Sequence, residues 1–68
     1  MNSIFWMDSK QVGDVKITLW HYGDYKYQIE FRLARTGEVL KSATMNLDCP
    51  YEAAKHEFLN QISRLTNL

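Results

Sequence analysis

The sequence predicts a small α+β domain in which a three-stranded antiparallel meander is covered on one face by a C-terminal helix. Apolar and polar residues alternate over residues 25–33, as on a strand with one buried and one solvated face. Over residues 51–65, apolar residues recur every three or four positions, as on an amphipathic helix. Strands with one apolar face are typical of antiparallel sheets that are covered on a single side.

The length of 68 residues predicts a single domain, spanning 1–68. The one cysteine, Cys49, cannot form a disulfide within the chain, which favours a reducing, cytoplasmic compartment. The sequence has no signal-peptide pattern, and its apolar runs are far too short to span a membrane, so we expect no membrane partner.

The N-terminal residues 1–11 leave three interpretations open. The apolar run 4–7 suits a short extra edge strand, a segment that packs across the core, or a contact with a partner. Residues 8–11 read as a loop. Because a small sheet has open edges, Phe5 and Trp6 or one of these edges could also support a homodimer.

The first predicted strand covers about residues 14–21, and the second covers about 25–33. A two-residue turn at Gly23 and Asp24 would put the apolar side of one strand on the polar side of the other, so burial disfavours it. A three-residue loop, 22–24, aligns the apolar sides. It predicts the pairs Leu19 with Tyr27, Ile17 with Ile29, Val15 with Phe31, Lys16 with Glu30 and Asp14 with Arg32.

A turn at Gly37 leads into the third predicted strand, about residues 39–47. Its apolar positions alternate with polar ones, except that Lys41 falls on the apolar side. Either Lys41 lies at the sheet margin with its ammonium in water, or a bulge near Gly37 shifts the phase.

The C-terminal helix is predicted over about residues 50–66. Pro50 suits the first helical turn, Asp48 or Cys49 is the expected cap, and Glu52 suits the positive N-terminal end of the helix. The apolar stripe that should pack on the sheet consists of Tyr51, Ala54, Phe58, Ile62 and Leu65.

The sequence shows no pattern typical of a catalytic, metal or cofactor site. Cys49 and His56 lie two helical turns apart, about 10 Å along the axis, which is too far for a nucleophile and its base. A structural zinc site needs four ligands, and the glycines are too isolated to form a phosphate loop. We therefore expect no enzymatic activity, no metal and no cofactor.

The side of the sheet that the helix leaves uncovered is the predicted binding surface. It combines cations, an amide and an indole, although a solvated sheet face would have a similar composition. The candidate binding residues are Lys16, Trp20, Lys26, Gln28 and Arg32.

The layout resembles that of two DNA-binding families. Residues 27–31, a turn at Thr36 and Gly37, and a helix opening with residues 50–54 are similar to the amino-terminal arm-binding domain of phage integrases and to the plant ethylene-response domain. In those families a three-stranded sheet reads the major groove of DNA. The resemblance implies such a role for the five candidate residues. However, this chain departs from the basic character of those families, with Glu30 in the middle of the face.

Two functions follow as expectations. The first is a small regulatory or inhibitory module that binds a protein partner, similar in size and layout to phage-encoded inhibitors, with a phage or mobile-element origin. The second is a double-stranded DNA-binding module that uses the exposed sheet face. The net charge of zero favours the first.

Overall fold

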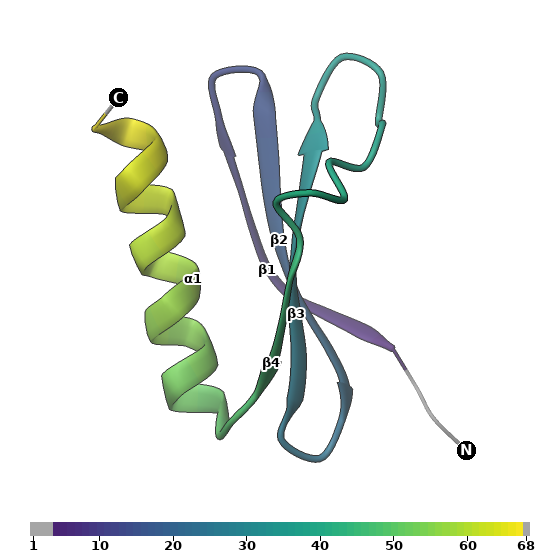
Figure 1. Cartoon of the computed structure of the whole chain (residues 1–68), viewed down its shortest axis with the longest axis vertical. Helices are drawn as coiled ribbons and strands as arrows, with labels where there is room; N and C mark the ends of the chain where they lie inside the picture. The colour runs from purple at the N-terminus through teal and green to yellow at the C-terminus, as the bar shows by residue number, and fades with distance from the viewer. Residues whose placement is uncertain (1–3, 68) are drawn as a thin grey trace.

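The computed structural model describes residues 4–67 and confirms the α+β class, with an antiparallel sheet and one C-terminal helix (Figure 1). The predicted count of three strands is wrong, because the sheet has four, in the order β1-β2-β3-β4. The elements are β1 (Phe5–Val12), β2 (Val15–Gly23), β3 (Lys26–Leu33), β4 (Met45–Asp48) and α1 (Tyr51–Thr66).

The extra N-terminal edge strand is β1, and it is longer than the sequence suggested. Residues 8–11, predicted as a loop, pair with β2 along their whole length. The turn between β1 and β2 consists of Gly13 and Asp14, with Val12 opposite Val15. Gly13 has a φ of +60°, which two-residue hairpin turns commonly require. This turn was the readable signal for β1, and the sequence interpretation overlooked it.

The pairing of β2 with β3 confirms the predicted faces but not the predicted register. The pairs are shifted by two residues, so that Ile17 lies opposite Phe31 and Leu19 opposite Ile29. A shift of two preserves every face, so the apolar pattern could not distinguish the two registers. The expected charge pairs favoured the wrong one. The observed register instead places His21 opposite Tyr27, and their rings stack with centroids 4.6 Å apart.

The β2–β3 connection also differs from the predicted three-residue loop. Gly23 pairs with Lys26, so the turn has two central residues, Asp24 and Tyr25. An irregularity between His21 and Gly23 leaves Tyr22 as an extra residue, and this bulge restores the alignment of the apolar faces. Burial therefore excludes a regular two-residue hairpin but permits one that contains a bulge.

The predicted strand over 39–47 is wrong in its first half, since β4 covers only four residues. Val39 forms an isolated bridge with Arg32, whereas Met45 pairs with Ile29, so extra residues must loop out between the two positions. They form a turn in which the backbone N–H of Ala43 donates to the carbonyl of Leu40 at 3.0 Å. The turn leaves Lys41 exposed, which resolves its conflict with the apolar pattern.

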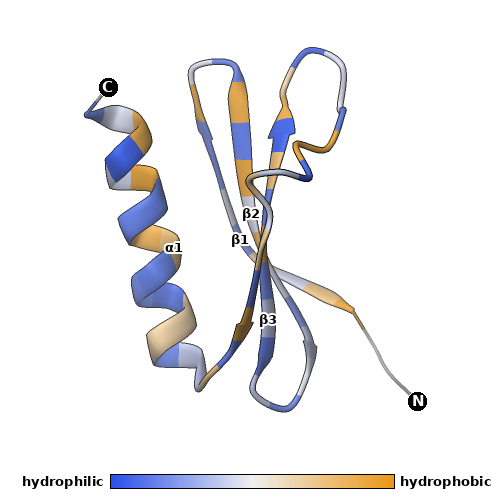
Figure 2. Ribbon diagram, viewed as in Figure 1, coloured by the Kyte–Doolittle hydropathy of each residue, from blue (hydrophilic) through white to orange (hydrophobic). Residues whose placement is uncertain are grey.

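The helix α1 packs on one face of the sheet and completes the core. Figure 2 shows apolar residues of α1 on the side turned toward the sheet. Ala54 and Phe58 are buried, while Ile62 and Leu65 pack at the margin. The cap is Pro50, with no side-chain hydrogen bond, so the expectation of Asp48 or Cys49 is wrong. Among residues 4–67, the buried side chains are those of Ile17, Thr18, Leu19, Tyr27, Ile29, Phe31, Ala54 and Phe58. Within residues 4–67, no helix is long and apolar enough to cross a membrane.

Candidate functional site

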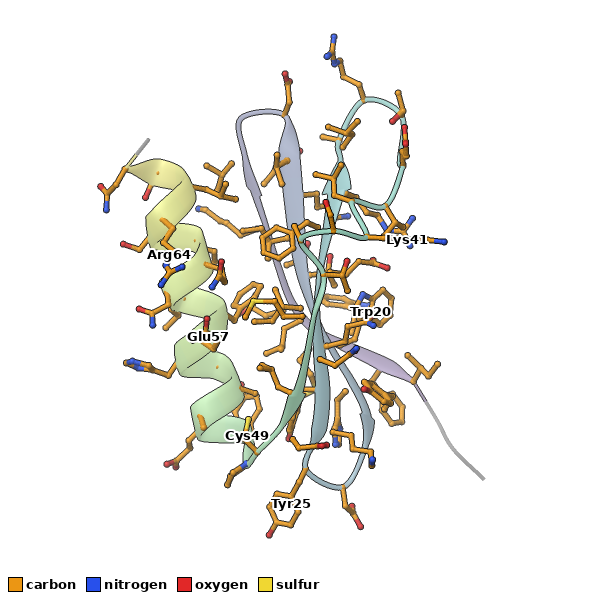
Figure 3. The ribbon with its side chains drawn as sticks, viewed as in Figure 1. Trp20, Tyr25, Lys41, Cys49, Glu57 and Arg64 are labelled. Carbon is orange, nitrogen blue, oxygen red and sulfur yellow. The ribbon has the colours of Figure 1, made fainter. Side chains whose placement is uncertain are left out.

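The face of the sheet opposite α1 carries the candidate site, and we call it the open face. Figure 3 shows Trp20 on this side, directed away from the helix. The strand pairing places residues from β1, β2 and β3 next to one another on it. The open face consists of Trp6, Ser9, Lys16, Thr18, Trp20, Gln28, Glu30 and Arg32.

Two tryptophans from neighbouring strands are the large apolar groups of the open face. Trp6 of β1 lies directly opposite Trp20 of β2. Trp6 is 66% exposed, whereas Trp20 is half-buried. Both line a shallow hollow of about 330 Å³, which we call the tryptophan hollow. The hollow is completed by Ser9, Lys16, Thr18, Glu30 and Arg32.

Glu30 lies at the centre of the polar network in this hollow, with a side chain that is 12% exposed. Its Oε1 accepts from Arg32 Nε at 2.7 Å and from Trp20 Nε1 at 3.2 Å, and its Oε2 accepts from Arg32 Nη2 at 3.3 Å. These bonds to a charged donor explain how a largely buried carboxylate is tolerated. They also fix the Trp20 indole in one orientation.

Arg32 is held from both sides. Besides Glu30, its Nη1 donates to the carbonyl of Gly37 at 3.0 Å. The hydrogen bond that Arg32 donates to Glu30, followed by the negative charge of that carboxylate, raises the pKa of the Arg32 guanidinium above its usual value. The side chain remains 41% exposed, so part of the guanidinium can still meet a partner.

Lys16 of β2 lies directly opposite Arg32 of β3, whereas the sequence predicted that it would pair with Glu30. Like charges in directly opposed positions destabilise a sheet slightly. Lys16 forms no ion pair with any other residue between 4 and 67. With Glu30 neutralised by Arg32, the tryptophan hollow carries one unmatched positive charge.

The structure brings three of the five predicted binding residues, Lys16, Trp20 and Arg32, to the tryptophan hollow. Gln28 lies opposite Trp20 and lines a second hollow of about 420 Å³ on the other side of the indole. Its Nε2 donates to Asn46 Oδ1 at 3.0 Å. Lys26 lines neither hollow; it lies at the hairpin end, 3.9 Å from Asp48 in an exposed ion pair.

The sequence interpretation missed the contribution of β1 to the site. Trp6 and Ser9 enter the tryptophan hollow because β1 pairs along the whole of β2. The apolar pattern of β1 is interrupted at Met7, where the register with β2 shifts, so alternation alone could not reveal which residues face outward.

The chemistry of the open face suits recognition. Its titratable groups are Lys16, Glu30 and Arg32, and the Glu30 carboxylate is already occupied by hydrogen bonds. Over residues 4–67, His, Cys, Asp and Glu side chains do not gather in a group of three that could hold a metal ion. The open face therefore offers indole surface, hydroxyls and unmatched positive charge.

The chain was also compared with known proteins. No family model, no curated protein and no solved structure matches it.

Proposed function

We propose that the protein is a small non-enzymatic module that regulates or inhibits a protein partner by binding it through the open face. The single observation that carries this proposal is the exposed Trp6 beside the half-buried Trp20, above a hollow with a cationic rim. Tryptophan and arginine are the residues most enriched among those that dominate binding energy at protein interfaces. The apolar surface of the open face extends to Ile4, which is 68% exposed and lines the second hollow beside Trp20.

The charge of the open face favours an acidic segment of the partner. The unmatched charge of Lys16 and the exposed part of Arg32 suit a carboxylate beside an apolar anchor in the hollow. Such binding needs positive charge only at the hollow, so it is compatible with a net charge of zero for the whole chain.

Double-stranded DNA binding is the second candidate, and the opposed Lys16 and Arg32 favour it. Two features weigh against it. Glu30 already uses Arg32 Nε and Nη2, which leaves less of the guanidinium for a bidentate contact with guanine. The net charge is zero, whereas the affinity of DNA-binding proteins is dominated by cation–phosphate contacts.

Affinity capture with three baits tests the first proposal. The baits are the wild type, Trp6→Ala, and Leu59→Ala as a matched control, because Leu59 is 52% exposed on the helix side. We expect the wild type and Leu59→Ala to retain the same partner and Trp6→Ala to lose at least tenfold in yield, since anchor truncation commonly costs about 2 kcal/mol or more. Equal yields from all three baits would show that the open face is not the binding surface.

A mobility-shift series with a random duplex at rising salt tests the alternative. A protein that neutralises several phosphates loses affinity steeply, with a log–log slope of about −0.9 per phosphate. If the duplex is shifted at low salt and Lys16→Gln reduces the slope by about one phosphate, DNA binding replaces the first proposal. We expect no shift.

A homodimer through β1 stays a prediction beside these two. β1 is an edge strand, and its Phe5 and Trp6 are both exposed. Light scattering at increasing protein concentration distinguishes this outcome, because a dimer raises the mass in the absence of any partner.

A further inference from the structure

A third hollow lies on the opposite side of the sheet, where the β2–β3 turn meets the start of α1. Its volume is about 440 Å³. Four of its five lining residues carry aromatic rings, and the fifth is a carboxylate. We call it the tyrosine pocket, and it is lined by His21, Asp24, Tyr25, Tyr27 and Tyr51.

Packing fixes the inner wall of the tyrosine pocket. Tyr27 is 6% exposed, and His21 stacks on it with an interplanar angle of 18°. The Tyr51 ring lies 6.1 Å from the Tyr27 ring, inclined by 46°. Packing therefore holds the Tyr27 and His21 rings in place, with the Tyr51 ring beside them at the start of α1.

Tyr25 supplies the outer part of the pocket from an unusual backbone conformation. Its φ is +58°, in the left-handed region that a bulky residue rarely occupies. The backbone N–H of Cys49 donates to the Tyr25 carbonyl at 2.8 Å, which ties this turn to the segment just before α1 (Figure 3). Backbone strain of this kind persists where the surrounding structure holds it, often at binding sites. The Tyr25 side chain is 64% exposed, so burial of its ring does little to offset the cost of this backbone conformation.

The charge at the tyrosine pocket favours a cation. Asp24 forms no ion pair with any other residue of the described chain. The faces of aromatic rings carry negative potential and attract ammonium groups. Lys55 already makes a contact of this kind, since its Nζ lies 6.0 Å from the centre of the Tyr51 ring.

We propose that the tyrosine pocket binds an alkylated ammonium group, with the aromatic rings against its methyl groups and Asp24 compensating its charge. An alkylated ammonium suits the pocket better than a bare one, because its methyl groups replace the water that a primary ammonium holds strongly. Such a group occurs on a methylated lysine side chain or on a free quaternary amine. This site is separate from the open face and does not depend on the function proposed there.

A titration of the full chain with choline, followed by NMR at constant ionic strength, tests the charge requirement. The matched ligand is the neutral carbon analogue of choline, in which a tert-butyl group replaces trimethylammonium. We expect choline to shift the resonances of Tyr25, Tyr27 and Tyr51 and to bind about tenfold more tightly than the analogue. Equal binding of choline and its neutral analogue would overturn the proposal.

Three variants and a control test the named residues. Tyr25→Leu keeps apolar bulk but removes a ring face, and Asp24→Asn removes the charge, so each should weaken choline binding severalfold. Lys55→Gln should strengthen it, because it removes the competing cation on Tyr51. Tyr22→Leu, in the same hairpin but lining the second hollow of the open face, should leave it unchanged. Circular dichroism checks that each variant is folded, and a folded Lys55→Gln that binds choline more weakly would contradict the proposal.

A peptide with one trimethyllysine, compared with its unmodified counterpart, identifies the source of the group. Tighter binding of the methylated peptide than of choline indicates a protein side chain, whereas the reverse indicates a free quaternary amine. If neither choline nor the methylated peptide binds, the proposal is wrong, whatever the result for the open face.

Discussion

At the scale of single residues, Glu30 determines what the open face presents to a partner. Its carboxylate orients Trp20 and Arg32 together, so an indole and a guanidinium have fixed positions before any partner arrives. Ordering these side chains in advance reduces the entropy that binding must overcome. The neutralisation of Arg32 also makes Lys16 the unmatched charge of the tryptophan hollow.

We expect Glu30→Gln to lower the free energy of unfolding by about 1–2 kcal/mol, because hydrogen bonds to a charged partner are lost in a site that is only partly screened by solvent. The matched control is Glu38→Gln, since Glu38 is exposed and belongs to no ion pair of the described chain. Its unfolding free energy should change by less than about 0.5 kcal/mol. Urea denaturation measures both, and equal losses in the two variants would show that the Glu30 network adds nothing to stability.

Tyr27 makes stability depend on pH at the alkaline end. Burial raises the pKa of its phenol above the ordinary value of 10.0. A group whose pKa is higher in the folded state holds its proton longer there than in the unfolded chain, so stability falls as pH rises above that ordinary value. We expect the unfolding free energy to drop between pH 9 and 11 and to drop less in Tyr27→Phe. The control, Tyr22→Phe, should behave as the wild type in the same urea titrations.

At the scale of elements, the sequence predicted faces well and registers poorly. The alternation over 25–33 correctly identified Tyr27, Ile29 and Phe31 as buried. It could not choose between registers that differ by two residues, because both bury the same set. The choice depends on the bulge at Tyr22 and on the stacking of His21 with Tyr27, and neither has a pattern of its own in the sequence.

The hairpin of β1 with β2 depends on the left-handed backbone of Gly13. A Cβ at this position would meet no atom within 4 Å, so a substitution acts through the backbone alone. We expect Gly13→Ala to cost about 1 kcal/mol of unfolding free energy, and Gly13→Asn to cost about half as much, because asparagine tolerates this region better. Thermal unfolding followed by circular dichroism ranks the stabilities of the wild type and the two variants. Alanine at least as stable as asparagine would mean that the turn does not require this conformation.

At the scale of the whole molecule, the candidate site was predictable only in part. Lys16, Trp20 and Arg32 could be placed on one face because strands alternate. Trp6 could not, because its face depends on the irregularity of β1 near Met7. The tyrosine pocket could not be predicted from the sequence, for a different reason. It joins a hairpin turn to the start of α1, and this contact depends on how the helix lies across the sheet.

Phe58 is the largest of the α1 side chains that attach the helix to the sheet, and all three hollows depend on that sheet. Phe58 is 1% exposed and is the largest fully buried residue in the described part of the chain. Phe58→Ala should cost about 3–5 kcal/mol, against a total of about 3–10 kcal/mol for a chain of this size. We therefore expect its urea midpoint to fall by half or more, with a substantial unfolded fraction in buffer.

Leu59 is the adjacent control for this change. It is 52% exposed, so Leu59→Ala should cost less than about 1 kcal/mol, although it removes a side chain of similar apolar character from the same helix. Phe58→Leu keeps most of the buried volume and should give an intermediate midpoint. The urea midpoint should therefore be highest for Leu59→Ala, intermediate for Phe58→Leu and lowest for Phe58→Ala. Similar midpoints for the two alanine variants would mean that α1 does not depend on Phe58 for its packing.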